Sequence, residues 1–167
     1  QSATRGTAPE ADIPNSFYWQ DYLGDLDYVR TAVASARKHF EENGGNPEEL
    51  KLFVNDYNLE SDWDNNGKLK SLIQWIKDWA ADGVTKIDGI GSQMHISCYG
   101  NPQTQESKKN AIVNMLKLMA ESGKLVRISE LDMAYVDETG KSVNTNDMTE
   151  EQHKQMRELY EFVIKKY

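Results

Sequence analysis

Two carboxylates, Glu130 and Asp132, stand two residues apart where an apolar run from Leu125 to Ile128 gives way to polar sequence. If that run is a strand, both side chains point to one face, because side chains alternate with period two along a strand. Two acids on one face at the end of a buried strand cost desolvation energy unless something there uses them. The segment is therefore the first candidate for chemistry, although a strand-end turn with two solvated carboxylates is an open alternative on spacing alone.

The elements that must position this pair alternate between helical and strand patterns. Apolar residues at helical spacing predict helices over residues 29–40, 69–80, 112–119 and 156–163, and apolar runs predict strands over residues 52–54, 87–96 and 125–131. A capping box, Thr149-Glu150-Glu151-Gln152, begins the last helix. This alternation is typical of a parallel α/β fold. A closed eight-stranded barrel needs about 250 residues, so a chain of 167 residues with three visible strands is short for the fold that it implies.

Polar side chains gather where each predicted strand ends. Asn55 to Asn58 follow the first strand, Gln93 and His95 the second, and the carboxylate pair the third. The carboxyl ends of parallel strands meet at one edge of the sheet, where barrels place their active sites. Amide, imidazole, phenol and carboxylate groups suit a hydroxyl-rich ligand, and Trp63, in the loop after the first strand, is a further candidate to face it. The alternatives are turn chemistry for residues 55–58 and a structural role for His95.

Composition and motifs narrow the function classes. The net charge of −8 argues against nucleic acid as a partner, and no apolar run approaches the length that spans a membrane. No second histidine lies at ligand spacing from His95, so we expect no metal. We expect no other cofactor either, because Gly89-Ile90-Gly91 lacks the third glycine of a dinucleotide loop. Residues 1–15 are small and polar and predict a lead-in or loop.

The three strand ends together resemble glycoside hydrolase family 10, the retaining endo-1,4-β-xylanases built on a (β/α)8 TIM barrel. The motifs that carry the resemblance are Leu52-Phe53-Val54-Asn55-Asp56-Tyr57-Asn58, Gly89-Ile90-Gly91-Ser92-Gln93-Met94-His95 and Ile128-Ser129-Glu130-Leu131-Asp132, preceded by Phe17-Tyr18-Trp19-Gln20-Asp21-Tyr22-Leu23-Gly24. They are similar to the family's strands five, six and seven and to the start of its fourth helix. The resemblance covers residues 16–167 and implies a partial (β/α)8 barrel, with xylan or xylo-oligosaccharide as the ligand.

The resemblance also assigns roles. Glu130 matches the family's nucleophile, His95 the histidine that hydrogen-bonds to it, and Asp132 the acid that orients the histidine. Gln93 and Tyr57 match residues that line the subsites around the cleaved bond. Asn55 and Trp63 join them as substrate-binding candidates, from the same strand end and the loop after it. A hydrogen bond from histidine would favour the ionised carboxylate that a nucleophile requires.

Several parts of the family pattern are missing from the 167 residues, among them strands one to three and strand eight of the barrel. The general acid/base is a glutamate in a Trp-Asp-Val-Val-Asn-Glu-like run, and no such run occurs here. We therefore expect the C-terminal half of a catalytic barrel, inactive alone and prone to self-association or to pairing with the other half. The alternatives are a non-catalytic half-barrel that binds saccharide and a related barrel glycosidase acting on β-glucan. Since polymeric xylan cannot enter a cell, we expect the parent protein to be secreted, on the cell surface or periplasmic.

Overall fold

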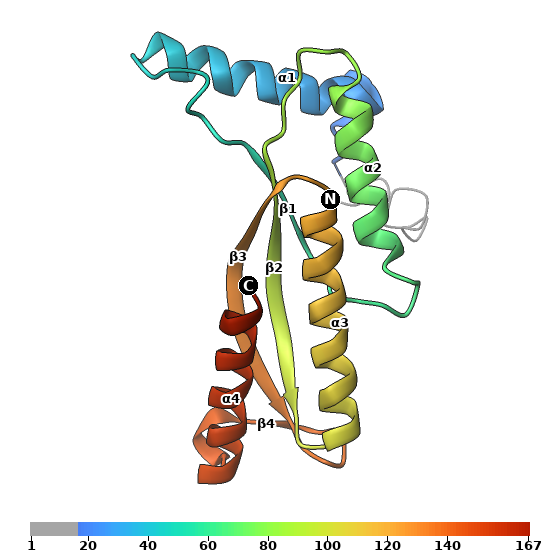
Figure 1. The fold of residues 1–167 in the computed structure, drawn as a ribbon, viewed down its shortest axis with the longest axis vertical. Helices are drawn as coiled ribbons and strands as arrows, with labels where there is room; N and C mark the ends of the chain where they lie inside the picture. Colours follow the sequence, from blue (N-terminus) through green and yellow to red (C-terminus); the bar gives the residue numbers. More distant parts are fainter. Residues whose placement is uncertain (1–16) are drawn as a thin grey trace. The chain divides into compact units, whose positions relative to one another are not determined.

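The computed structural model describes residues 17–167, so the lead-in predicted over residues 1–15 lies outside the described residues. Helices and strands alternate along the chain (Figure 1), and most of the strands run parallel. The four strands form one sheet in the order β1-β2-β3-β4. The elements are α1 (Gln20–Glu42), β1 (Phe53–Tyr57), α2 (Gly67–Ala80), β2 (Gly89–Tyr99), α3 (Pro102–Glu121), β3 (Leu125–Val136), β4 (Ser142–Val143), a 3-10 turn (Thr145–Asp147) and α4 (Glu150–Lys166). The architecture confirms the predicted partial (β/α)8 barrel.

The contacts of the chain divide it into two compact units. The first unit comprises residues 17–54 and 70–89, and the second comprises residues 55–69 and 90–167. The second unit contains most of β2 and all of β3 and β4, with α3 and α4 packed against β3 and against each other (Figure 1). Every predicted site residue lies in this second unit.

The core of the second unit is built from alternate residues of β2 and the inward stripes of two helices. Ile90, Ser92, Met94, Ile96 and Cys98 point to one face of the strand, and all five are buried. The buried helical residues are Ala111, Ile112, Met115 and Met119 of α3 with Leu159 and Val163 of α4. Because side chains alternate along a strand, this packing leaves the other face of β2, with Gln93 and His95, away from the helices.

A part-buried ion pair organises the first unit around the start of two strands. The carboxylate of Asp88 accepts a hydrogen bond from the Leu52 amide at 2.9 Å and from Arg37 at 3.1 Å. Arg37 also donates to the carbonyl oxygens of Pro47 at 2.8 Å and Lys86 at 2.9 Å. Asp88 immediately precedes β2 and Leu52 immediately precedes β1, so this cluster holds the two strands together where they begin.

The helix predictions are confirmed. Both hydrogen bonds of the α4 capping box are present. The Thr149 hydroxyl accepts a hydrogen bond from the Gln152 amide, and the Gln152 side chain accepts one from the Thr149 amide. Within residues 17–167, none of the helices is both long and apolar enough to cross a membrane.

The predicted strand ends are wrong in two of three cases. β3 continues through Glu130 and Asp132 to Val136, and β2 continues past His95 to Tyr99, so these side chains lie within strands and not at a loop. Polar side chains do not end a strand when they project from a face that water reaches, since the backbone pairing is unaffected. The short β4, which pairs antiparallel with β3 through Tyr135 and Val136, was also not predicted.

The first predicted strand end is close to the observed one. β1 includes Asn55, Asp56 and Tyr57, and the chain turns at Asn58, which has a left-handed φ of 58°. The turn chemistry considered for residues 55–58 therefore applies to Asn58 alone, where asparagine tolerates the left-handed region.

Candidate active site

The second unit brings the carboxylate pair of β3 against the histidine of β2. Nδ1 of His95 donates a hydrogen bond to Oδ2 of Asp132 at 2.5 Å, and Nε2 of His95 lies 3.2 Å from Oε2 of Glu130. Both ring nitrogens therefore face a carboxylate, and the two acids share one face of β3, as their spacing predicted. The three side chains are 47% (His95), 48% (Glu130) and 67% (Asp132) exposed, so a ligand in solution can reach them.

The two acids change the protonation of the ring between them. The hydrogen bond to Asp132 is the main factor that raises the pKa of His95 above its ordinary value, and the negative charges of Asp132 and Glu130 add to it. Desolvation acts in the opposite direction and is outweighed. A protonated ring donates from both nitrogens at once, which is the only state of imidazole that satisfies both carboxylates.

A missing side chain on β2 makes room for one of the predicted binding residues. The Asn55 side chain of β1 lies over Gly91, where an added Cβ would come within 1.7 Å of Oδ1 of Asn55. Gly91, Gln93 and His95 alternate along the same face of β2, so the amide of Asn55 shares this face with the His95 ring. Asn55 is exposed and Gln93 is half-buried.

The remaining predicted residues, Tyr57 and Trp63, are both exposed and lie on the chain segment that leaves β1. Tyr57 is the last residue of β1. Trp63 is in the loop before α2, and within residues 17–167 no hydrogen bond or ring contact fixes its indole. The geometry thus joins Glu130, His95 and Asp132 in one contact network, whereas Trp63 is not tied to it.

Two features of this region gave no signal in the sequence. Lys68, at the start of α2, contacts Asp56 and Tyr57 at the end of β1. Glu60 has a carboxylate oxygen that is buried without a hydrogen-bond partner among the described residues, and burial raises its pKa although Lys68, Lys108 and His95 oppose the shift. Neither feature is visible in residue spacing, because each depends on contacts between separate elements.

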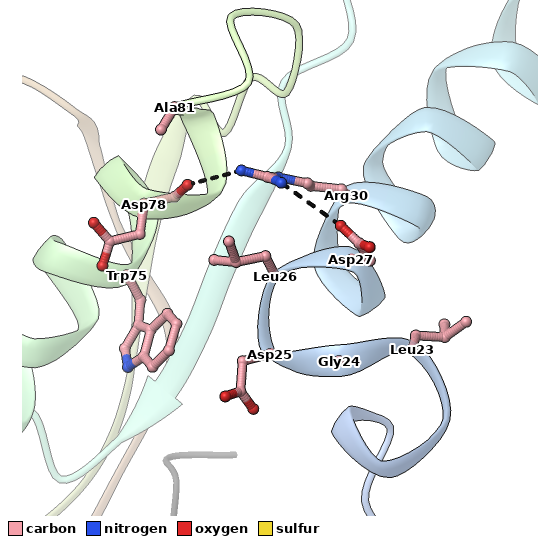
Figure 2. A pocket seen from close by; sticks show the side chains of 9 residues that line it. All are labelled: Leu23, Gly24, Asp25, Leu26, Asp27, Arg30, Trp75, Asp78 and Ala81. Carbon is pink, nitrogen blue, oxygen red and sulfur yellow. Dashed lines mark hydrogen bonds and ion pairs between the residues drawn. The ribbon is translucent and has the colours of Figure 1, made fainter.

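A hollow of about 760 Å³ lies elsewhere, within the first unit, and none of the predicted site residues lines it. Figure 2 shows Arg30 of α1 extended across this hollow toward Asp78 of α2, with Trp75 on the wall below. Arg30 donates to the carbonyl oxygens of Trp79 and Asp78, both at 3.1 Å, and lies 3.6 Å from Asp27. The guanidinium is therefore occupied in joining the two helices.

The described residues hold no group of three or more histidine, cysteine or acidic side chains arranged to bind a metal ion. The chemistry available at the site is that of the Glu130 carboxylate beside His95, whose two ring nitrogens each face a carboxylate. Such a carboxylate is suited to act as a nucleophile or as a base toward a ligand on the open face of the sheet.

Comparison with known proteins gives the same family from sequence and from structure. The family model described as "Glycosyl hydrolase family 10" matches residues 8–167. An endo-1,4-β-xylanase from Halalkalibacterium halodurans is 32% identical over 152 residues, covering 86% of this chain and 34% of that protein. The crystal structure of an endo-1,4-β-xylanase from Caldicellulosiruptor owensensis superposes with a TM-score of 0.66 at 27% identity, covering 90% of this chain and 40% of that one.

A third match has a bound saccharide. A mutant of an intracellular xylanase from Thermoanaerobacterium saccharolyticum, solved in complex with xylotetraose, superposes with a TM-score of 0.61 at 27% identity, covering 89% of this chain and 37% of that one. The chain thus spans between about a third and two fifths of these three proteins. Since the family model matches nearly the whole of the sequence, the chain belongs to glycosyl hydrolase family 10.

Proposed function

We propose that the protein is a retaining endo-1,4-β-xylanase in which Glu130 is the nucleophile. The observation that carries this proposal is the bonding of His95, whose two ring nitrogens face Glu130 at 3.2 Å and Asp132 at 2.5 Å. A nucleophilic carboxylate must stay ionised, and a cationic histidine beside it favours that form. The xylanases that this chain resembles supply the substrate class, the internal β-1,4-xylosidic bonds of xylan.

The proposed reaction proceeds in two displacements. An oxygen of Glu130 attacks the anomeric carbon, the glycosidic C–O bond breaks, and a second carboxylic acid gives its proton to the departing sugar oxygen. That second group then takes a proton from water, the water oxygen attacks the anomeric carbon, and the bond to Glu130 breaks with net retention. The two carboxylates of a retaining enzyme lie about 5 Å apart. Because the 167 residues contain no Trp-Asp-Val-Val-Asn-Glu-like run, we propose that the acid/base belongs to a part of the protein outside them.

The residues around Glu130 have supporting roles in this proposal. Asp132 fixes the orientation of His95 and keeps a proton on Nδ1, and His95 directs its other N–H to the nucleophile. Asn55 and Gln93 offer amide donors and acceptors to sugar hydroxyl groups, while the exposed rings of Tyr57 and Trp63 offer surfaces on which a xylose ring can stack.

Trapping of the covalent intermediate tests this function directly. The full-length protein is incubated with an activated 2-deoxy-2-fluoro-β-xylobioside, which slows the second displacement, and the labelled peptide is identified by mass spectrometry. We expect the adduct on Glu130, complete loss of xylan hydrolysis in Glu130→Gln, and no loss in the matched variant Glu138→Gln, which changes an exposed glutamate in the turn after β3. An adduct on another residue, or a product of inverted configuration, would disprove the assignment.

Two further measurements separate the proposed xylanase from a β-glucan hydrolase and test whether the half-barrel is inactive alone. Activity on carboxymethylcellulose that exceeds activity on xylan would favour a β-glucan hydrolase of the same family. The polypeptide of residues 1–167, assayed alone, is expected to be inactive and to self-associate in size-exclusion chromatography; hydrolysis of xylan by this polypeptide would show that it needs no carboxylate from elsewhere.

A further inference from the structure

The ammonium group of Lys68 makes three contacts with two consecutive residues at the end of β1. It lies 2.9 Å from Oδ1 of Asp56, donates to the carbonyl oxygen of Tyr57, and stands 3.8 Å from the centroid of the Tyr57 ring. All three residues belong to the second unit. Lys68 is the second residue of α2, so the helix fixes the origin of its side chain.

The position of the ammonium is determined by a buried partner. The Asp56 side chain is 7% exposed and the Lys68 side chain 20% exposed. A carboxylate so far removed from water must be paired, because an unpaired buried charge is strongly destabilising. Lys68 is therefore held in place by Asp56, whether or not the tyrosine ring is beside it.

The same pair fixes the main chain of Tyr57 from both sides. Oδ1 of Asp56 accepts the Tyr57 amide at 2.8 Å, and Lys68 donates to the Tyr57 carbonyl. Asn58, the next residue, takes the left-handed conformation that ends the strand. With the backbone fixed and a cation against the ring, the side chain of Tyr57 has little freedom, yet the residue is 57% exposed.

An exposed aromatic ring that is already immobilised is a favourable surface for a sugar. Binding a ligand with a mobile side chain requires that side chain to lose rotational freedom, and this loss weakens affinity by about two- to tenfold for each rotamer-rich side chain. A ring that is fixed before the ligand arrives avoids this loss. Within residues 17–167, Lys68 provides the only cation stacked on the Tyr57 ring.

We propose that Lys68 is a positioning residue, which holds the Tyr57 ring in the orientation that stacks against a xylosyl unit of the substrate. This inference rests on the proposed xylanase function and extends it to a residue on α2 that need not touch substrate. Lys68 acts through the ring, so its removal should weaken substrate binding and leave the chemical step unchanged.

A double-mutant cycle in the full-length protein tests the inference. Lys68→Met is combined with Asp56→Asn, so that no buried charge is left unpaired, and the pair is measured with and without Tyr57→Ala. With the ring present, KM for xylotetraose should rise about two- to tenfold while kcat changes less than about twofold. In the Tyr57→Ala background, the combined Lys68→Met and Asp56→Asn substitutions should leave KM at the value of Tyr57→Ala alone.

Two variants separate positioning from general destabilisation. Lys68→Arg keeps a cation that can pair with Asp56 and stack on the ring, so it should restore most of the wild-type KM. Lys70→Met changes an exposed lysine two residues further along α2 and should have no effect on KM.

The outcomes distinguish this inference from the function on which it rests. An unchanged KM, a fall in kcat alone, or an equal rise of KM with and without the ring would overturn the role of Lys68 while the wild-type protein still hydrolyses xylan. A wild-type protein that hydrolyses no xylan and binds no xylotetraose would overturn the proposed function, and the inference with it.

Discussion

Replacing Arg37 by methionine is expected to lower the thermal stability of the protein, because this side chain neutralises the buried carboxylate of Asp88. The Asp88 side chain is 6% exposed and that of Arg37 is 18% exposed, with 3.1 Å between the charged atoms. Asp88 also accepts the Leu52 amide and lies 3.8 Å from the half-exposed Lys86, so it is not left entirely unpaired.

The size of the effect follows from these contacts. Breaking a buried pair by removing one partner costs about 3–5 kcal/mol. The pair is only part-buried and Lys86 remains near Asp88, so the expected loss lies at the lower end, about 3 kcal/mol. For a chain of this size, about 1 kcal/mol lowers Tm by roughly 2–4 °C, so we expect a decrease of about 6–12 °C. Lys38→Met is the matched control on the same helix. Its side chain is 69% exposed and pairs with Glu42 at 3.7 Å, which is worth about 0.5 kcal/mol or less.

The pH dependence of this difference provides a second test. Burial alone would raise the pKa of Asp88, but the Leu52 amide and Arg37 outweigh it, so the pKa is lower than usual in the folded protein. A lowered folded pKa means that the stabilisation is fully present above the unfolded pKa of about 3.9 and is lost as pH falls through the folded value. Circular dichroism melts of Arg37→Met and Lys38→Met should therefore show that the difference in Tm between the two variants is smaller in acid than at pH 7. A Tm decrease no larger than that of Lys38→Met, or a gap of constant size, would refute the reasoning.

Three further changes have defined outcomes. Asp132→Asn should lower the pKa of His95, followed by NMR titration of the ring, because the bond to Asp132 is the main factor that raises it; an unchanged titration would contradict the geometry. Since that pKa is raised on folding, the bond stabilises the fold at acidic pH and its contribution is lost as pH rises through the folded value. Gly91→Ala should lower stability by about 1 kcal/mol or less in denaturant unfolding, because the added Cβ meets only the end of the exposed Asn55 side chain, which can turn away, and adding Asn55→Ala should recover most of the loss. Thr149→Ala should cost about 1 kcal/mol in the same assay through loss of the α4 cap, and equal stability would argue against the capping box.

Helix α3 was predictable because its buried residues repeat at helical spacing. Ile112, Met115 and Met119 repeat on one stripe of α3, and all three are buried. The strand boundaries were harder, because β3 keeps its alternation beyond the polar pair: Leu131, Met133 and Tyr135 share one face, opposite Glu130 and Asp132. Polar residues on an open face resemble a loop in sequence, and only the pairing with neighbouring strands shows that the strand continues.

The candidate site was predictable to the extent that it depends on period two and on the resemblance. Alternation placed Glu130 and Asp132 on one face, and the family motif placed His95 beside them. Lys68 was not predictable, because its position at the start of a helix gives no indication that it reaches back to Asp56. Such contacts depend on how a helix docks after its loop, which residue spacing does not encode.

The proton affinity of the His95 ring is expected to change between the two steps of the proposed reaction. In the free protein the imidazole is flanked by two negative charges, those of Glu130 and Asp132. On the proposed pathway Glu130 becomes a neutral ester in the first displacement, so the ring then has one anionic neighbour and holds its proton less firmly. Hydrolysis of the ester restores the second charge. On that pathway the proton affinity of His95 falls and recovers once in every turnover, so this ring would report whether the proposed nucleophile is free or occupied.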